Sequence, residues 1–181
     1  MRNRVWIYLA LCLMPEVSLG ESICDDHGGL KTPLGVLQEQ VCRIPNRPGS
    51  SVTQFLLEKK IVLSGSYPMM FRHANKANSL LVIEGSQDPS LACPARTFLI
   101  DLTGNKPRVF AFGVKNACAE YHWASWGKKR SVIAIKENIR FTYSNGKLMP
   151  PPPDFGDGIP LVRRYPEDQR NWPFVEELPI P

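Results

Sequence analysis

The chain has 181 residues, of which 43% are hydrophobic, and a formal net charge of +5 at pH 7. This length suits a single domain with its own core, and it is too short for a propeller of four ordinary blades. The charge is uneven, because residues 21–153 carry 17 Lys and Arg against 10 Asp and Glu, whereas residues 154–181 carry 3 against 6. A basic body with an acidic tail favours contact between the two or an acidic partner, with plain solubility as the alternative.

The first twenty residues have the layout of a cleaved secretory signal. Two arginines precede an apolar run at 5–14, and small residues stand at Ser18 and Gly20. The run is ten residues long, whereas a helix that crosses a bilayer needs about 20. We therefore expect a secreted or periplasmic protein without a transmembrane segment, in which residues 1–20 are removed and residues 21–153 form the domain.

Four cysteines follow the expected cleavage site. An even number of cysteines in an exported chain predicts two disulfides, which disfavours a cysteine nucleophile and a zinc site. The four are Cys24, Cys42, Cys93 and Cys118.

A hairpin argument selects the disulfide pairing. Residues 97–102 and 108–112 are strand-like and flank a turn, so they predict an antiparallel β-hairpin. If Thr103 faces Arg108, the same register places the last two cysteines opposite each other, where a disulfide can form. A bulge or another register would remove this alignment. The predicted pairs are Cys93–Cys118 and, by elimination, Cys24–Cys42.

The N-terminal part of the domain predicts one short helix. Residues 21–30 are polar and irregular, and Thr32 followed by Pro33 is a typical helix start. Apolar side chains then recur at helical spacing within residues 34–41, which favours a helix that ends before Pro45.

From residue 55 onward the pattern is that of β-strands. The residues of 139–143 alternate between apolar and polar, as in a strand with one face in water. Asn145-Gly146 accepts positive φ at both positions and is the strongest hairpin signal in the chain. We predict a mainly β fold, an antiparallel meander of six or seven strands in a sandwich or a partly open barrel. The predicted strand runs are 55–64, 79–85, 97–102, 108–112, 131–136 and 139–143.

Two segments outside these runs contain apolar side chains. Met69, Met70 and Phe71 fall in the first connection, and we expect them to be buried under a long loop rather than exposed as a contact surface. The four prolines of 150–153 end the domain, and 154–181 is predicted to be an extended, acidic, Pro-rich tail. Its end, 171–178, mixes apolar anchors with acids, a pattern that fits packing back on the body or docking into another protein.

Catalytic and metal-binding motifs are weak. No Gly-x-Ser-x-Gly elbow occurs, and the histidines have no partner at ligand spacing, so we expect no bound metal or cofactor. Asp101, Glu120 and Glu137 are candidate acid/base groups, but their spacing does not require any two of them to face each other. The histidines are His27, His73 and His122.

The stretch 121–130 is the richest candidate surface. Its aromatic and basic side chains are types that dominate protein interfaces and that stack on sugar rings. The alternative is that the tryptophans plug one end of the core and the cations form a solvated turn. The candidate binding residues are Tyr121, Trp123, Trp126, Lys128, Lys129 and Arg130.

These features favour a non-enzymatic binding protein that acts outside the cytosol. An inhibitor or immunity-type protein directed at a cell-envelope partner, either a protein or an envelope glycan, fits the size and compartment by analogy. A nucleic-acid partner is not expected, since no recognised motif is present. The alternatives are a secreted hydrolase of glycans or peptides, and a structural envelope subunit whose tail engages a neighbour.

Overall fold

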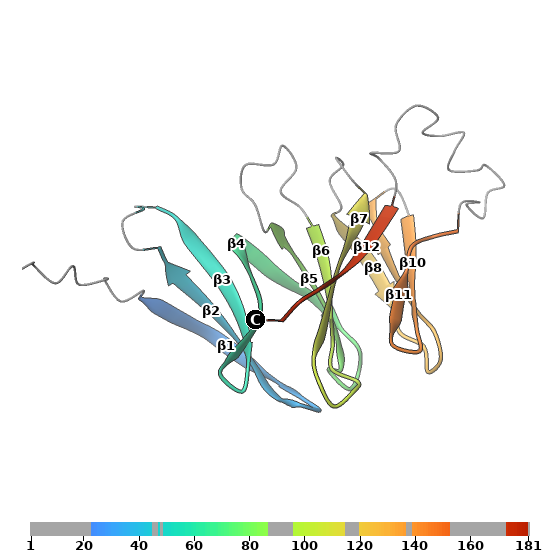
Figure 1. The fold of residues 1–181 in the computed structure, drawn as a ribbon, viewed down its shortest axis with the longest axis horizontal. Coiled ribbons are helices and arrows are strands. Elements are labelled where there is room, and N and C mark those ends of the chain that lie inside the picture. The colour runs from blue at the N-terminus through green and yellow to red at the C-terminus, as the bar shows by residue number, and fades with distance from the viewer. Residues whose placement is uncertain are drawn as a thin grey trace, which may run out of the picture.

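The computed structural model describes residues 23–44, 47, 49–86, 96–114, 120–136, 139–152 and 173–180. Within these ranges the protein is mainly β, and every strand pair is antiparallel (Figure 1). One sheet has eight strands in the order β1-β2-β3-β4-β5-β6-β7-β12, and the other has four in the order β11-β10-β9-β8. The strands are β1 (Cys24–Thr32), β2 (Gly35–Arg43), β3 (Ser51–Leu57), β4 (Lys60–Ala74), β5 (Leu80–Ser86), β6 (Arg96–Asp101), β7 (Arg108–Val114), β8 (Tyr121–Ser125), β9 (Ser131–Ile135), β10 (Ile139–Ser144), β11 (Lys147–Met149) and β12 (Pro173–Leu178).

The eight-stranded sheet turns a corner inside β4. Up to Ser66 this strand pairs with β3, and from Ser66 onward it pairs with β5, with register shifts between Ser66 and Met70 and between Phe71 and His73. Strands that bend or bulge in this way pass from one packed sheet to another. We therefore describe three layers: β1–β3 with the start of β4, then the rest of β4 with β5, β6, β7 and β12, then β8–β11.

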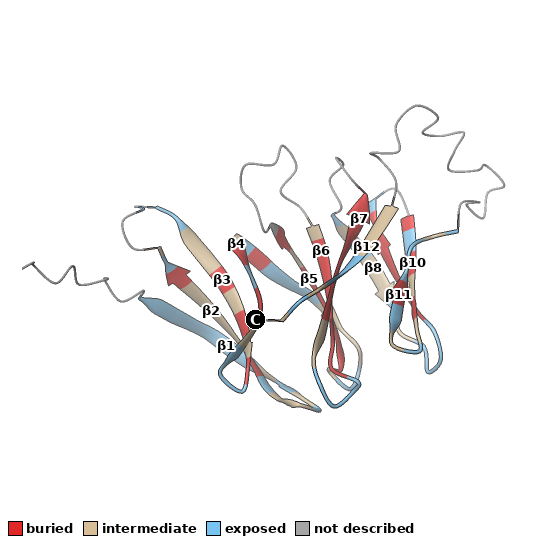
Figure 2. Cartoon of the chain, viewed as in Figure 1, coloured by how far each residue is buried: buried red, intermediate tan, exposed pale blue. Residues whose placement is uncertain are grey.

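The middle layer is apolar on both faces. In β7, Val109 and Ala111 belong to the core shared with the first layer, whereas Phe110 and Phe112 belong to the core shared with the third. Five of the six residues of β6 and six of the seven of β7 are accordingly buried. The outer layers show the period of two expected for strands with one covered face, as in β3 and β10 (Figure 2).

A buried carboxylate links the middle and third layers. Asp101 is only 3% exposed, and its Oδ2 accepts a hydrogen bond of 2.7 Å from the Tyr143 hydroxyl of β10. Its Oδ1 accepts from the Thr103 amide at 2.9 Å and from the Thr103 hydroxyl at 2.6 Å. Both oxygens are therefore paired, as a buried carboxylate requires.

The C-terminal strand completes the middle layer. β12 pairs with β7 and places Phe174, Leu178 and Ile180 against the first core and Val175 against the second. The tail was predicted to be extended, and the part of it that the structure describes is a strand that pairs with β7 of the same domain. Residues 153–172 lie outside the described ranges.

The short helix predicted near residue 34 is wrong. Residues 35–43 form β2, and residues 24–32, which were expected to be irregular, form β1. The two strands are joined by a tight turn, in which Gly35 has a φ of 123°, and a disulfide joins Cys24 to Cys42 at directly opposed positions. Cross-strand packing overrode the apolar spacing that favoured a helix.

The strand count was also underestimated. The run 55–64 contains the end of β3, a two-residue turn and the start of β4. Glu58 and Lys59 both have positive φ in this turn, 48° and 67°, without the Asn or Gly that usually marks such a hairpin. Twelve strands therefore stand in the described residues, where six or seven were predicted.

The expected loop after residue 66 is instead part of β4. Met69 is buried at 2% exposure, as predicted, but Met70 and Phe71 are 42% and 44% exposed. The predicted burial of these three residues is therefore right only for Met69.

The hairpin of β6 and β7 was predicted, but its register differs by two residues. Asp101 faces Arg108, whereas the prediction placed Thr103 there. The register from which the Cys93–Cys118 pairing was predicted is therefore wrong. Both cysteines lie outside the described residues, so that disulfide stays a prediction.

No helix in the described ranges has the length and apolarity needed to cross a membrane.

Close contact at the β4 corner gives the first test. A Cβ added to Gly85 would lie 2.9 Å from the backbone Cα of Met69, whereas one added to Gly104 would meet nothing nearer than 3.8 Å. We expect Gly85→Ala to lower the free energy of unfolding by about 1–3 kcal/mol, because the corner must shift. Gly104→Ala, the control, should stay within about 0.5 kcal/mol. Urea denaturation of both variants measures this, and equal stability would contradict the proposed crowding.

Tyr143 gives a pH-dependent test. Burial raises the pKa of its phenol to about 12, and the hydrogen bond to Asp101 acts in the same direction. An unfolded tyrosine titrates near 10, so the stability contributed by the neutral phenol is complete below about pH 10 and is lost as the pH rises toward 12. The urea midpoint of the wild type should therefore fall more steeply across this range than that of Tyr143→Phe. Parallel curves would contradict the assignment.

Candidate functional site

The predicted binding stretch forms β8 and the turn that leads to β9. β8 is an edge strand of the four-stranded layer and pairs only with β9. The register shifts between Tyr121, which faces Ile135, and Trp123, which faces Ala134. Because this bulge adds one residue to β8, the two aromatic side chains lie on opposite faces of the layer, although they are two positions apart.

The inward-facing side chains of β8 and of the turn that follows it contact β4 and β5. Tyr121 and Trp126 pack against the second core, and the Tyr121 hydroxyl lies 3.0 Å from Nδ1 of His73. The backbone amide of Tyr121 donates to Oε2 of Glu84 at 3.0 Å, and Glu84 also accepts two hydrogen bonds of 3.1 Å from Arg72. Tyr121 and Trp126 are therefore interlayer contacts rather than a free surface.

The electrostatics of this contact agree with that role. Burial raises the pKa of Tyr121. The Trp126 ring lies 5.8 Å from the ring of His73, and its buried Nε1 has no hydrogen-bond partner in the described part of the chain. Trp126 therefore contributes by packing.

The outward face of the same layer carries Trp123. Trp123, Ala134 and Arg140 form one row across β8, β9 and β10, with the Arg140 guanidinium carbon 5.8 Å from the centre of the Trp123 ring. Ala134 is fully buried although it lies on the outward side, which places larger side chains over it. Cations and indole rings attract each other in this arrangement.

The next row adds hydroxyl groups and further cations. Ser125 and Thr142 lie outward in register with Val132, and Arg130 donates to the Thr142 hydroxyl at 3.1 Å. Lys147, opposite Ser144 in the β10–β11 pair, is exposed. We call the set Trp123, Ser125, Arg130, Arg140, Thr142 and Lys147 the Trp123 face.

This face has a basic character. The strands β8 to β11 contain Arg140 and Lys147 but no Asp or Glu. Lys128, Lys129 and Arg130 are all exposed in the turn that leads into β9. The structure therefore divides the six predicted residues into four that are exposed or outward and two that are interior, Tyr121 and Trp126.

The predicted acid/base carboxylates do not form a site in the described residues. Asp101 uses both oxygens for the links to Thr103 and Tyr143, and Glu120 forms an ion pair of 3.3 Å with Lys136. Glu137 lies outside the described ranges. Across those ranges, no three His, Cys, Asp or Glu side chains are grouped so as to hold a metal ion.

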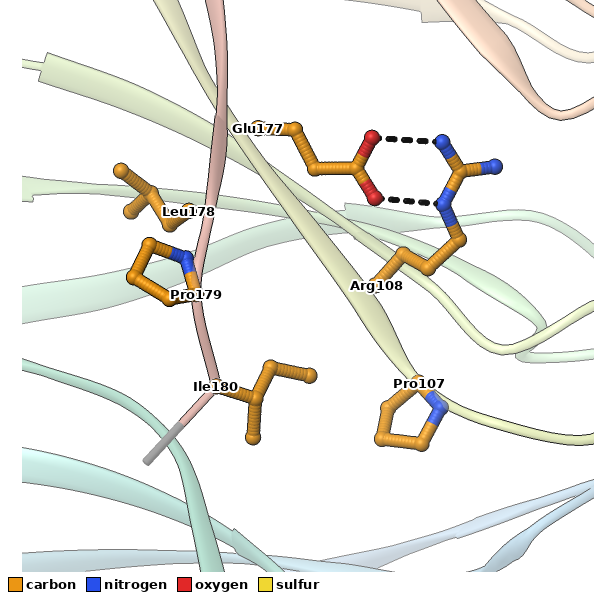
Figure 3. A pocket seen from close by; sticks show the side chains of 6 residues that line it. All are labelled: Pro107, Arg108, Glu177, Leu178, Pro179 and Ile180. Atoms are coloured by element: carbon orange, nitrogen blue, oxygen red, sulfur yellow. Dashed lines mark hydrogen bonds and ion pairs between the residues drawn. The ribbon is translucent and has the colours of Figure 1, made fainter.

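Two hollows were not predicted. One, of about 540 Å³, lies between the start of β7 and the C-terminal strand (Figure 3). Its charged groups are committed to each other: the Arg108 guanidinium donates two hydrogen bonds of 2.7 Å to Glu177, which lowers the pKa of that carboxyl. The residues are Pro107, Arg108, Glu177, Leu178, Pro179 and Ile180.

The second hollow lies on the first layer and measures about 310 Å³. Nothing in the sequence marks either hollow, because each joins segments that meet only through the fold.

Comparison of the chain with protein-family models, curated protein sequences and solved structures gives no match.

The two tryptophans of β8 and its turn should respond differently to truncation. We expect Trp126→Ala to lower the free energy of unfolding by about 2–4 kcal/mol, because it removes a core contact. Trp123→Ala should cost less than about 1 kcal/mol, because this half-exposed side chain does not pack against the second core. Equal losses in urea denaturation would contradict the division of the stretch into an inward and an outward face.

Proposed function

We propose that this chain is an exported, non-enzymatic binding protein that holds an acidic macromolecular partner on the Trp123 face. The observation that carries the proposal is the outward indole of Trp123 beside the Arg140 guanidinium, on strands that contain no carboxylate. Trp and Arg are the side chains that most often dominate interface energies. The exposed ammonium groups of Lys128, Lys129 and Lys147 attract an acidic partner.

The composition of the face supports a protein partner. A sheet face that combines an indole ring with arginine and hydroxyl side chains matches the composition of protein interfaces. We therefore favour an acidic protein of the cell envelope over a glycan.

Export and an inhibitory role belong to the same proposal. The Cys24–Cys42 disulfide is compatible with an oxidising compartment. An inhibitor or immunity-type function is our hypothesis for the consequence of binding, drawn from size and class. The envelope-subunit alternative gains no support from the tail end, because β12 pairs with β7 of the same chain.

The test is affinity capture from an envelope extract with the oxidised full chain as bait. We expect the wild type to retain one acidic protein, identified by mass, and Trp123→Ala combined with Arg140→Ala to weaken its binding at least tenfold, as interface hot spots do. Lys31→Ala combined with Lys60→Ala removes two cations of the first layer and serves as the matched control.

The control variants distinguish binding at the Trp123 face from a general effect of the net charge. Circular dichroism and the urea midpoint should show that both double variants are folded. If the control loses the partner as strongly as the Trp123–Arg140 variant, only net charge matters. If both variants retain the partner fully, the Trp123 face is not the binding site.

A further inference from the structure

The hollow on the first layer is an apolar pocket with one carboxylate. Leu37 and Phe55, which line it, are 5% and 2% exposed. Phe71 of β4 and the segment 27–30 of β1 complete the lining together with Glu39. Its volume of about 310 Å³ lies at the lower end of the range for small-molecule sites.

Its position follows from the path of β4 after the corner. The Met69 amide donates to the Thr53 hydroxyl of β3 at 3.3 Å, and the Asn78 side chain, just beyond β4, donates to the Lys31 carbonyl of β1 at 3.0 Å. The second part of β4 therefore crosses the first layer from β3 toward β1. Phe71 lies between these two contacts in sequence and forms part of the pocket wall.

Glu39 is the charged group that the fold leaves without an ion pair in this pocket. It lies between Leu37 and Val41 on β2 and faces Phe55 of β3. In the described part of the chain, the Glu39 carboxylate neither accepts a hydrogen bond nor forms an ion pair within 4 Å. Burial raises the pKa of Glu39, and the neighbouring His27 lowers it by a smaller amount. A half-buried carboxylate without a partner is costly.

Charge complementarity selects the occupant. Among the residues that line the pocket, Glu39 is the one acidic side chain, and none of them is Lys or Arg. An anionic ligand would be repelled here, and a neutral apolar ligand would leave the Glu39 carboxylate without a partner. A ligand with an apolar body and a protonated amine satisfies both parts of the pocket.

We propose that this pocket binds a small apolar primary amine, with its ammonium group on Glu39 and its hydrocarbon part against Leu37, Phe55 and Phe71. The site is separate from the Trp123 face, so the two proposals succeed or fail independently.

The test is calorimetric titration of the oxidised full chain with 2-phenylethylamine, and with 2-phenylethanol as the neutral analogue of the same shape. We expect the amine to bind at least tenfold more tightly than the alcohol. Glu39→Gln should weaken amine binding by roughly tenfold to a hundredfold, the range for a hydrogen bond to a charged group, and should leave alcohol binding unchanged. Phe71→Ala should weaken both ligands.

Asp25→Asn is the matched control, because it removes a carboxylate of β1 that does not line the pocket. It should leave amine binding within about twofold, since an exposed charge contributes little. Circular dichroism establishes that each variant is folded. Equal affinity of the wild type for amine and alcohol would overturn the proposal, as would equal losses in Glu39→Gln and Asp25→Asn, or no binding of the amine at millimolar concentration.

Discussion

The structure depends on one constraint: the middle layer is apolar on both faces, and another layer must cover each of them. Phe98 and Phe112, both fully buried, lie on opposite faces of the middle layer. One cover is the same sheet folded back through the corner in β4, where Met69 meets the bare backbone of Gly85. The other is the separate layer β8–β11. Because each cover has one wet face, the alternating strands are the outer ones and the continuously apolar strands are central.

Polar links at the strand ends hold the covers in place. The Asp101–Tyr143 hydrogen bond and the Tyr121–Glu84 contact tie the third layer to the middle layer at separate strands, and the Arg108–Glu177 pair ties β12 to β7. A layer fixed at several points loses little freedom when its outward face binds a partner, and this preorganisation favours affinity. The interior side chains of β8 thus support the Trp123 face without belonging to it.

The sequence predicts those parts of the fold that depend on local chemistry. The alternation in β10 and the Asn145-Gly146 turn were both visible, and the structure confirms the turn between β10 and β11. Two of the misses have one cause, contacts between segments that are separate in the sequence, and the third is a turn of unusual composition. The apolar residues near Leu37 lie in a strand that pairs with β3, and β12 pairs with residues that are 59 to 69 positions earlier in the chain. The Glu58–Lys59 turn lacks the Asn or Gly that usually marks such a hairpin.

The same limit explains the candidate site. The composition of 121–130 identified a surface rich in aromatic and basic side chains, but only the bulge after Tyr121 decides which side chains face outward. Arg140 belongs to the Trp123 face because β10 lies two strands from β8 in the same layer. The positions of the two residues in the sequence do not reveal this. The two proposed sites also differ in charge and in depth: cations lie on the outward face of the third layer, and a half-buried carboxylate shares the lining of the first-layer pocket with Phe71. Salt screens exposed charges more than buried ones, so ionic strength acts more strongly on the Trp123 face than on the Glu39 pocket.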